Sequence, residues 1–422
     1  MSIELSASDR AMLDGELGEA ARLAIRIVAD LAGVMDADRL IDVASAHVDG
    51  CLYHGPAGLE FAERLVAGGA AVSVPTTLNT GSLDLLHPEL VRETPERANA
   101  ARRQMDLYAA MGCRATWTCA PYQLPGRPSL GQHIAWAESN AIVFANSVLG
   151  ARTNRYGDFI DICAAITGRV PDAGLHREEN RRAELVFRLS GISERLLEED
   201  VLYPVVGQVV GREAGNAVVA IDGLPLDTTE DRLKALGAAA ASSGSVALFH
   251  AVGITPEAPT LDVALGGHRA SRTVEITPER LRAARDELTT TSREDVAAVT
   301  LGTPHFSLAE FEALMPLLDG IRVNPQVDLF ISTGRDVLSE VERRGWLPHV
   351  RAAGARIVTD TCPYITPIMR VKDGPVMTNS AKTAWYAPMN VGADVVFGSL
   401  EECVRSAVSG RVWRDERLWA DG

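Results

Sequence analysis

The sequence predicts an α/β protein with parallel sheets. From about Asp295 onward, short apolar runs alternate with helical patterns, which is typical of parallel strands joined by crossover helices. The chain has 422 residues, of which 46% are apolar, and this is enough for about two or three packed units. We expect a helical and α/β region over 1–200, a middle α/β region over 201–290 and a C-terminal α/β region over 291–422.

The N-terminal region is expected to open with helices. Apolar residues recur at helical spacing over 12–35 and again over 38–48. Residues 66–88 predict a strand that ends in a polar loop, and residues 97–112 predict a helix.

Strands dominate the expected second half. Apolar runs separated by glycine predict short strands over 205–211, 217–225 and 245–254. Further strands are expected over 296–305, 327–333, 355–362 and 393–399, with helices over 307–318 and 335–345. Three of these strands end in polar residues, namely Thr303–His305, Ser332–Thr333 and Thr361–Cys362. Because ligands bind at the carboxyl ends of strands in open α/β sheets, this pattern predicts an enzyme.

The charge of the chain argues against nucleic acid as a partner. The formal net charge is -15 and the pI is about 5.1, so a polyanion would be repelled. No run approaches the ~18 apolar residues that span a bilayer, and the charged N-terminus lacks the apolar core of a secretory signal. We therefore expect a cytoplasmic protein whose six cysteines form no disulfide framework.

Two cysteines lie close to prolines where elements are expected to end. Cys119 lies in ATWTCAPYQ, and Cys362 lies in VTDTCPYITP. Because proline stops a helix or strand from continuing, it holds each thiol in a turn, which suits a metal or cluster ligand as well as a core residue. The chain has no CxxC pair, so a zinc ribbon or ferredoxin-type cluster is disfavoured. The other cysteines are two expected core residues, Cys163 and Cys403, and two of intermediate context, Cys51 and Cys113.

Residues 131–150, GQHIAWAESNAIVFANSVLG, contain no proline and predict a long buried helix with Glu138 in its middle. The polar residues that accompany Glu138 are Asn140, Asn146, Ser147, Arg152, Thr153, Asn154 and Arg155. Burying such groups without partners costs about 1–3 kcal/mol each. They therefore form either a hydrogen-bonded network between domains or a wall that binds a carboxylate through its arginines. We favour the wall.

A second polar group lies in MTNSAKTAWYAP. Asn379, Ser380 and Lys382 are expected at the start of a helix, where they form either an anion site or an ordinary helix cap with a surface lysine. Weaker candidates for the lining of a cleft are His54, Thr76, Thr77 and Asn79. His305 lies near a strand end and is either a base or a structural hydrogen-bond partner. The glycine motifs of dinucleotide-binding and P-loop proteins do not occur, so nothing supports nucleotide binding.

Seven long stretches carry a family resemblance. They are YHGPAGLEFAERL, VPTTLNTGSLDLLHP, MGCRATWTCAPYQ, GQHIAWAESNAIVFANSVLGARTNRYGDF, LGTPHFSLAEF, TDTCPYI and MTNSAKTAWYAP. Together they run over nearly the whole chain, which resembles aconitase X of the aconitase superfamily. The resemblance implies aconitase-like α/β/α domains, an iron–sulfur cluster and a hydro-lyase that dehydrates a small hydroxy acid. The substrate is cis-3-hydroxy-L-proline in one bacterial branch of that family and mevalonate 5-phosphate in an archaeal branch.

The resemblance also implies ligands for the cluster. Cys119 and Cys362 match two cysteines that hold it. The archaeal pattern has a third cysteine in Gly-Cys-Pro-His, and this chain has Thr303 in that position. The difference argues against the archaeal cluster type and the archaeal substrate. Cys51 or Cys113 would then supply the third thiolate, and we favour Cys51.

The expected site holds the substrate carboxylate and moves a proton. Arg152, Asn154 and Ser380 are expected to bind the carboxylate, and Lys382 or Glu138 to transfer the proton, while a cluster iron accepts the hydroxyl. Aconitase-type enzymes also carry a small swivelling domain, which this chain is expected to lack. Either a separate small subunit supplies it, with the serine that serves as base in the family, or the chain works without it.

We expect dehydration of cis-3-hydroxy-L-proline to Δ1-pyrroline-2-carboxylate, through an enamine that rearranges to the cyclic imine. One alternative is dehydration of another hydroxy acid such as mevalonate 5-phosphate, for which the basic pair Arg152 and Arg155 is modest support. Two alternatives from other classes are an iron-sensing protein that binds RNA and an inactive scaffold subunit. The acidic charge of the chain argues against RNA.

Overall fold

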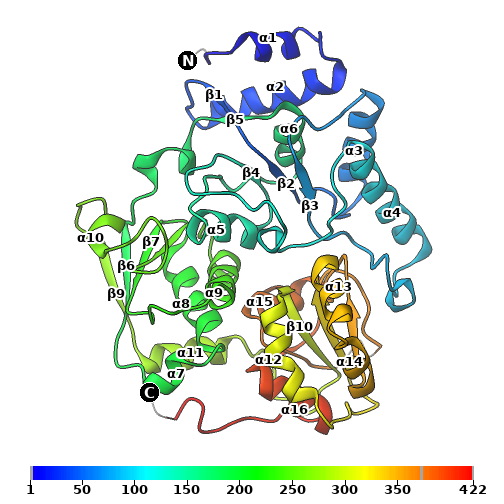
Figure 1. Cartoon of the computed structure of the whole chain (residues 1–422), viewed down its shortest axis with the longest axis vertical. Helices are drawn as coiled ribbons and strands as arrows, with labels where there is room; N and C mark the ends of the chain where they lie inside the picture. The colour runs from blue at the N-terminus through cyan, green and yellow to red at the C-terminus, as the bar shows by residue number, and fades with distance from the viewer. Residues whose placement is uncertain (1–2, 371–373, 421–422) are drawn as a thin grey trace. The chain divides into compact units, whose positions relative to one another are not determined.

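The computed structural model describes residues 3–370 and 374–420, which form two compact units (Figure 1). Unit 1 comprises residues 3–83 and 94–182, and unit 2 comprises residues 84–93, 183–370 and 374–420. Within the described ranges, each helix is too short or too polar to span a lipid bilayer.

Unit 1 is built on a three-stranded parallel sheet of order β3-β2-β4. Its strands are β2 (Ala46–Val48), β3 (Thr76–Leu78) and β4 (Ala135–Trp136), and a separate antiparallel pair joins β1 (Leu40–Asp42) to β5 (Arg169–Pro171). Its helices are α1 (Ala7–Leu13), α2 (Glu19–Val34), α3 (Pro56–Ala67), α4 (Pro95–Ala110), α5 (Ser139–Ser147) and α6 (Ile160–Thr167). Because the three strands of the sheet are parallel, their carboxyl ends meet at one edge.

Unit 2 contains two parallel sheets. The first has the order β8-β7-β6-β9, with β6 (Leu185–Leu189), β7 (Val219–Asp222), β8 (Phe249–Ala251) and β9 (Arg272–Ile276). Its helices are α7 (Glu194–Leu197), α8 (Leu202–Ala214), α9 (Glu230–Ser243), α10 (Leu261–Ala264) and α11 (Pro278–Glu287). In Figure 1 these elements are drawn in green.

The second sheet of unit 2 has five strands in the order β12-β11-β10-β13-β14. They are β10 (Ala298–Phe306), β11 (Asp328–Thr333), β12 (Ala355–Val358), β13 (Val376–Thr378) and β14 (Val395–Phe397). The accompanying helices are α12 (Leu308–Leu318), α13 (Arg335–Arg343), α14 (Leu347–Ala353), α15 (Ala381–Asn390) and α16 (Leu400–Ser409).

The largest apolar core of this second sheet lies on one of its faces. Side chains of α12, α13, α14 and α16 pack there against alternate residues of the strands, including Val299, Leu329 and Ile357. All nine residues of β10 are buried, as expected for a central strand that is covered on both sides. The polar residues at the end of β10 are therefore held in a rigid frame.

The expected parallel α/β architecture is confirmed, and so are most of the individual elements of the C-terminal half. Strands form where they are expected over 217–225, 245–254, 296–305, 327–333, 355–362 and 393–399, and helices form over 307–318 and 335–345. In unit 1 the strand within 66–88 and the helix over 97–112 also form, as β3 and α4.

The helix expected over 38–48 is wrong, because this stretch forms β1 and β2. All three residues of β2 are buried, so a short run that is covered on both sides shows no alternation of polar and apolar residues that would distinguish it from a helix. The helix expected over 12–35 is interrupted between α1 and α2. Gly15 and Gly18 adopt positive φ angles of 84° and 96° at this break, a conformation that a helix interior excludes.

The long helix expected over 131–150 is also wrong in its first half. The helix α5 begins only at Ser139, after β4 has paired with β2. Glu138 is the N-cap of α5 rather than a residue of its middle, and its side chain accepts the backbone N–H of Ala141 at 2.9 Å. The backbone of Glu138 is left-handed, with φ at 70°, which costs about 1–3 kcal/mol for a residue with a side chain.

The strand expected over 205–211 is a helix, α8, for a steric reason. Gly207 and Gly211 are four residues apart and lie on one helical face, so that α9 approaches closely. A Cβ atom added at Gly207 would meet the carbonyl oxygen of Leu236. The glycines that separate the valines therefore serve helix packing rather than strand ends.

Replacing Gly207 with Ala should destabilise unit 2 by about 1–3 kcal/mol, because the added methyl overpacks the contact between α8 and α9. Gly33→Ala is the matched control, since Gly33 lies in α2 with nothing within 4 Å of an added Cβ. That change should stabilise the protein by about 0.5–1 kcal/mol. Chemical denaturation measures both values, and equal effects of the two substitutions would contradict the packing argument.

Candidate active site

Three polar side chains follow the three parallel strands of unit 1. Asp49 comes directly after β2, Asn79 comes directly after β3, and Glu138 comes two residues after β4. The side-chain amide of Asn79 donates a hydrogen bond to Oδ1 of Asp49. Its own Oδ1 is buried and makes no hydrogen bond to any described residue. This edge of the sheet is therefore polar, and Oδ1 of Asn79 is an acceptor that no described residue uses.

A buried carboxylate holds the loop that carries Asp49. Oδ2 of Asp161, at the start of α6, accepts the backbone N–H groups of Asp49 at 2.7 Å and Gly50 at 3.0 Å. Burial raises the pKa of Asp49 to about 8, and the negative charges of Asp158, Glu138 and Asp161 act in the same direction. A positive charge at this edge would offset the repulsion among these acids.

His47 and Asn140 complete this edge. Nδ1 of His47 lies 2.8 Å from the Thr77 hydroxyl, and burial lowers the pKa of His47 to about 4 against the opposing charge of Glu138. Asn140, in the first turn of α5, donates to the carbonyl oxygen of Cys119 at 2.8 Å and to Glu138. Its side-chain oxygen accepts the hydroxyl of Tyr122 at 2.6 Å. Asn140 thus fixes the orientation of Glu138.

The polar residues after α5 form a hydrogen-bonded network inside unit 1. Oδ1 of Asn154 accepts the N–H of Leu175 at 2.7 Å, and the hydroxyl of Thr153 accepts the N–H of Trp136 at 3.1 Å. Arg152 pairs with Glu178, although its Nε is buried and makes no hydrogen bond among the described residues. Carboxylate binding by Arg152 and Asn154 stays a prediction, and Arg152 retains one donor for it.

Other predicted residues of unit 1 differ widely in exposure. His54 is exposed, whereas Thr76 is buried and donates to the carbonyl of Val74 at 2.8 Å. Cys51 is fully buried, and its thiol lies 3.4 Å from the carbonyl oxygen of Asn79. Cys119 is 4% exposed.

In unit 2, a cavity of about 40 Å³ brings together Asn379, Ser380 and Lys382. Thr303 lines it as well, and its carbonyl oxygen accepts the Ser380 hydroxyl. Ser380 is the N-cap of α15 and accepts the N–H of Thr383 at 3.1 Å, as the sequence predicts. Oδ1 of Asn379 is buried and makes no hydrogen bond among the described residues.

A buried ionic group lies beside this cavity. Lys234 on α9 is 3% exposed, and its Nζ lies 2.8 Å from Asp231 and is also paired with Glu310. Burial raises the pKa of Glu310 to about 7, and the nearby Lys234 opposes that shift. A larger cavity of about 350 Å³ adjoins these residues and shares Asn379 and Glu310 with the smaller one.

His305 and Cys362 offer metal ligands in unit 2. A ring nitrogen of His305 and Sγ of Cys362 lie within 4.8 Å of each other. The two side chains are 0% and 1% exposed. Thiolate and imidazole are donors for iron and zinc, so the pair fits a metal or cluster at the carboxyl ends of β10 and β12.

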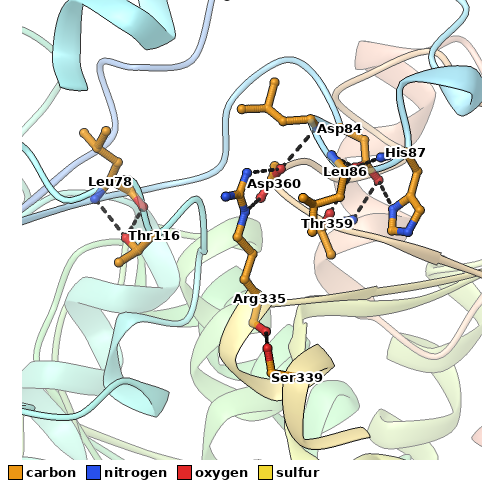
Figure 2. A network of polar contacts seen from close by, with 10 residues as sticks. Leu78, Asp84, Leu86, His87, Thr116, Arg335, Ser339, Thr359 and Asp360 are labelled. Carbon is orange, nitrogen blue, oxygen red and sulfur yellow. Dashed lines mark hydrogen bonds and ion pairs between the residues drawn. The ribbon is translucent and has the colours of Figure 1, made fainter. Parts of the chain in front are cut away.

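A network of carboxylates holds the loop that carries Cys362, as Figure 2 shows. Asp84 accepts the backbone N–H of Thr359 at 2.9 Å and its hydroxyl at 3.0 Å. Asp360 accepts two N–H groups of Arg335 at 2.7 and 2.8 Å, and the N–H of Leu85 at 3.1 Å. The segment 84–93 therefore fixes the loop after β12 through hydrogen bonds within unit 2.

Asp49 and Asp84 were missed by sequence reasoning. Asp49 directly follows a strand, which is the signal that identified Asn79, but the stretch before it resembles a helix. Asp84 accepts hydrogen bonds from Leu86 and His87 nearby in the chain, but its contact with the loop before Cys362 is made through Thr359, 275 positions away. No local pattern reports such a contact.

The chain has clear relatives. Sequence models of the aconitase X first, second and third domains match residues 2–179, 183–286 and 296–409. Cis-3-hydroxy-L-proline dehydratase of Pseudomonas aeruginosa is 46% identical over 96% of this chain and 70% of that protein, and the enzyme of that name from Hypocrea jecorina is 40% identical over 97% and 69%.

Other relatives match along their full length. The phosphomevalonate dehydratase large subunit of Methanothermobacter thermautotrophicus is 37% identical over 96% of this chain and 98% of that protein. The crystal structure of Thermococcus kodakaraensis aconitase X in its holo-form superimposes on this chain with a TM-score of 0.86. The two are 34% identical, and the match covers 96% of this chain and 100% of that one.

The pair of His87 and Asp84 should make stability depend on pH. The hydrogen bond to Asp84, 3.1 Å long, raises the pKa of His87. Its stabilising contribution is therefore complete below the ordinary histidine pKa of about 6.5 and is lost as the pH rises through the raised value. His87→Gln should lower the free energy of unfolding by about 0.5–1 kcal/mol more at pH 5.5 than at pH 8.5.

Urea denaturation at both pH values measures this difference. Ser339→Ala is the control, because Ser339 contacts only the backbone of Arg335 in the same network through a neutral hydrogen bond. Its effect should be equal at the two pH values. A pH-independent effect of His87→Gln would contradict the argument.

Proposed function

Because this chain belongs to the aconitase X family, we propose that it is a hydro-lyase that dehydrates cis-3-hydroxy-L-proline to Δ1-pyrroline-2-carboxylate. The observation that carries the proposal is its identity of 46% and 40% to two enzymes of that name, against 37% to the Methanothermobacter large subunit. Thr303 supports it, since the archaeal pattern has a cysteine there. Loss of water gives an enamine, which becomes the cyclic imine by moving a proton from nitrogen to carbon.

Dehydration of mevalonate 5-phosphate is the second candidate, because relatives of 37% identity or less carry the name phosphomevalonate dehydratase large subunit. The chain spans 98% of the Methanothermobacter large subunit but 70% of the Pseudomonas enzyme. A relative named a large subunit has a small subunit as partner. On the strength of that name, we propose that this chain also works with a separate small subunit.

We propose an iron–sulfur cluster as the cofactor. His305 and Cys362 fit such a group by their donor atoms and burial, and Cys119 is assigned to it by its sequence motif. When bound, an iron with an open coordination position would act as the Lewis acid for the departing hydroxyl. Burial raises the pKa of Cys51 well above its ordinary value, so Cys51 serves as the third thiolate only if a metal displaces its proton.

The remaining groups bind the substrate and move its proton. Within unit 2, Asn379 lines the small cavity and offers its side-chain N–H groups to a carboxylate, Ser380 would join it by releasing its hydrogen bond to Thr303, and Lys382, 4% exposed, transfers the proton. Within unit 1, Arg152 offers its remaining donor, and Glu138 is the second candidate for proton transfer. General acid–base catalysis of this kind contributes about 10²–10⁴-fold to a rate.

The direct test reconstitutes the chain anaerobically with iron and sulfide and assays it with each of the two substrates. Turnover of cis-3-hydroxy-L-proline, followed as imine formation, is the expected result. Turnover of mevalonate 5-phosphate alone would replace the proposed substrate. A cluster spectrum without turnover of either substrate would indicate that the small subunit is required, and failure to bind iron would overturn the proposal.

Cys362→Ala should remove most of the bound iron and its visible absorption, because it deletes a ligand. Cys403→Ala is the matched control, since Cys403 is an equally buried cysteine inside α16. That variant should keep both iron and absorption. Equal iron content in the two variants, measured on folded protein, would exclude Cys362 as a ligand.

A further inference from the structure

The carboxyl edge of the unit 1 sheet concentrates negative charge. Asp49 and Glu138 follow neighbouring parallel strands, and the charged side chains that act most strongly on Asp49 are Asp158, Glu138 and Asp161. All three are acids. Like charges in a partly desolvated place repel one another, so this arrangement favours a ligand that brings a positive charge.

Buried polar atoms at the same edge have unused hydrogen-bonding capacity. Asn79 is 2% exposed, and its amide nitrogen donates to Asp49 while its Oδ1 makes no hydrogen bond to a described residue. His47 is 0% exposed, and its Nε2 makes none either. Leaving buried polar atoms unpaired is costly, and such atoms in a native structure indicate a missing partner.

The backbone supports the same conclusion. Glu138 is held at a φ of 70°, and its carboxylate is fixed by the N–H of Ala141 and the side chain of Asn140. Backbone strain that persists in spite of its cost is concentrated at functional sites. The charge of Glu138 is thus held in place beside Asp49 rather than free to turn toward solvent.

We propose that Asp49 and Asn79 bind the protonated ring amine of the substrate, with Glu138 adding negative charge, so that unit 1 selects hydroxy acids that carry an ammonium group. A secondary ammonium has two N–H donors. The carboxylate of Asp49 and Oδ1 of Asn79 offer one acceptor for each. This inference rests on the proposed function and identifies the part of the substrate that unit 1 recognises.

A metal ion fits this edge less well than an ammonium group. Among the described residues, a set of three His, Cys, Asp or Glu side chains with ligand atoms within 4.8 Å of one another occurs elsewhere and includes neither Asp49, Glu138 nor His47. A metal ion needs its ligands that close. A phosphate dianion would be repelled by the same acids, so the edge discriminates against a phosphorylated hydroxy acid.

The test compares two unreactive ligands that differ at one atom. L-Proline carries the ring ammonium, and (S)-tetrahydrofuran-2-carboxylate carries a neutral oxygen in its place. Binding of each to the reconstituted full chain is measured by titration calorimetry at neutral pH. The unmodified chain should bind L-proline about 10- to 100-fold more tightly, the effect of a charged hydrogen bond.

Asp49→Asn should reduce this ratio to about 1- to 3-fold. The substitution keeps the size of the side chain and removes the carboxyl group that a bound ammonium would keep ionised. Glu138→Gln is a second isosteric variant that keeps an oxygen for the cap of α5, and it should lower the ratio by a smaller factor. Asp38→Asn is the control, because Asp38 is an exposed acid of unit 1 with 77% of its side chain accessible. It should leave the ratio unchanged.

The ratio of the two affinities tests amine recognition independently of the proposed function. Turnover of cis-3-hydroxy-L-proline without a preference for L-proline would overturn amine recognition and leave the function standing. A preference for L-proline that depends on Asp49, in a chain that turns over mevalonate 5-phosphate alone, would support amine recognition and count against the proposed substrate. A preference that survives both Asp49→Asn and Glu138→Gln, or no binding of either ligand, would overturn the assignment of these residues.

Discussion

Buried carboxylates fix the loops that carry the reactive side chains, and the candidate site depends on them. In unit 1, Asp161 accepts the backbone N–H groups of the loop that begins at Asp49. In unit 2, Asp84 and Asp360 hold the loop that ends at Cys362. A carboxylate that accepts hydrogen bonds from several N–H groups holds their loop rigidly. Each bond is charge-assisted, and each lost bond leaves a buried group unpaired.

The polar residues of unit 1 separate into two kinds once their partners are known. Thr153 and Asn154 make hydrogen bonds to the backbone of unit 1, and carboxylate binding by Asn154 stays a prediction. Asn79 and Arg152 each keep one buried atom without a hydrogen bond among the described residues. The second kind is the better candidate for ligand contact, because a ligand would satisfy an atom that the protein leaves unpaired.

The curated relatives fall into two branches of the family. The chain is most similar in sequence, among the relatives described above, to two enzymes that act as cis-3-hydroxy-L-proline dehydratases by name, yet it matches the archaeal large subunits along almost their whole length. An acidic edge suited to an amine agrees with the first branch.

The sequence by itself determined the parallel α/β class, the cap of α15 at Ser380 and the family, because strand–helix alternation, capping residues and long motifs are local patterns. Tertiary structure decided what those patterns leave open. Burial on both faces makes β2 a strand where its residues are equally compatible with a helix, and pairing with β2 delays the start of α5 to Ser139. The contact of Asp84 with Thr359 joins positions far apart in the chain, and only the folded chain brings such groups within reach of a hydrogen bond.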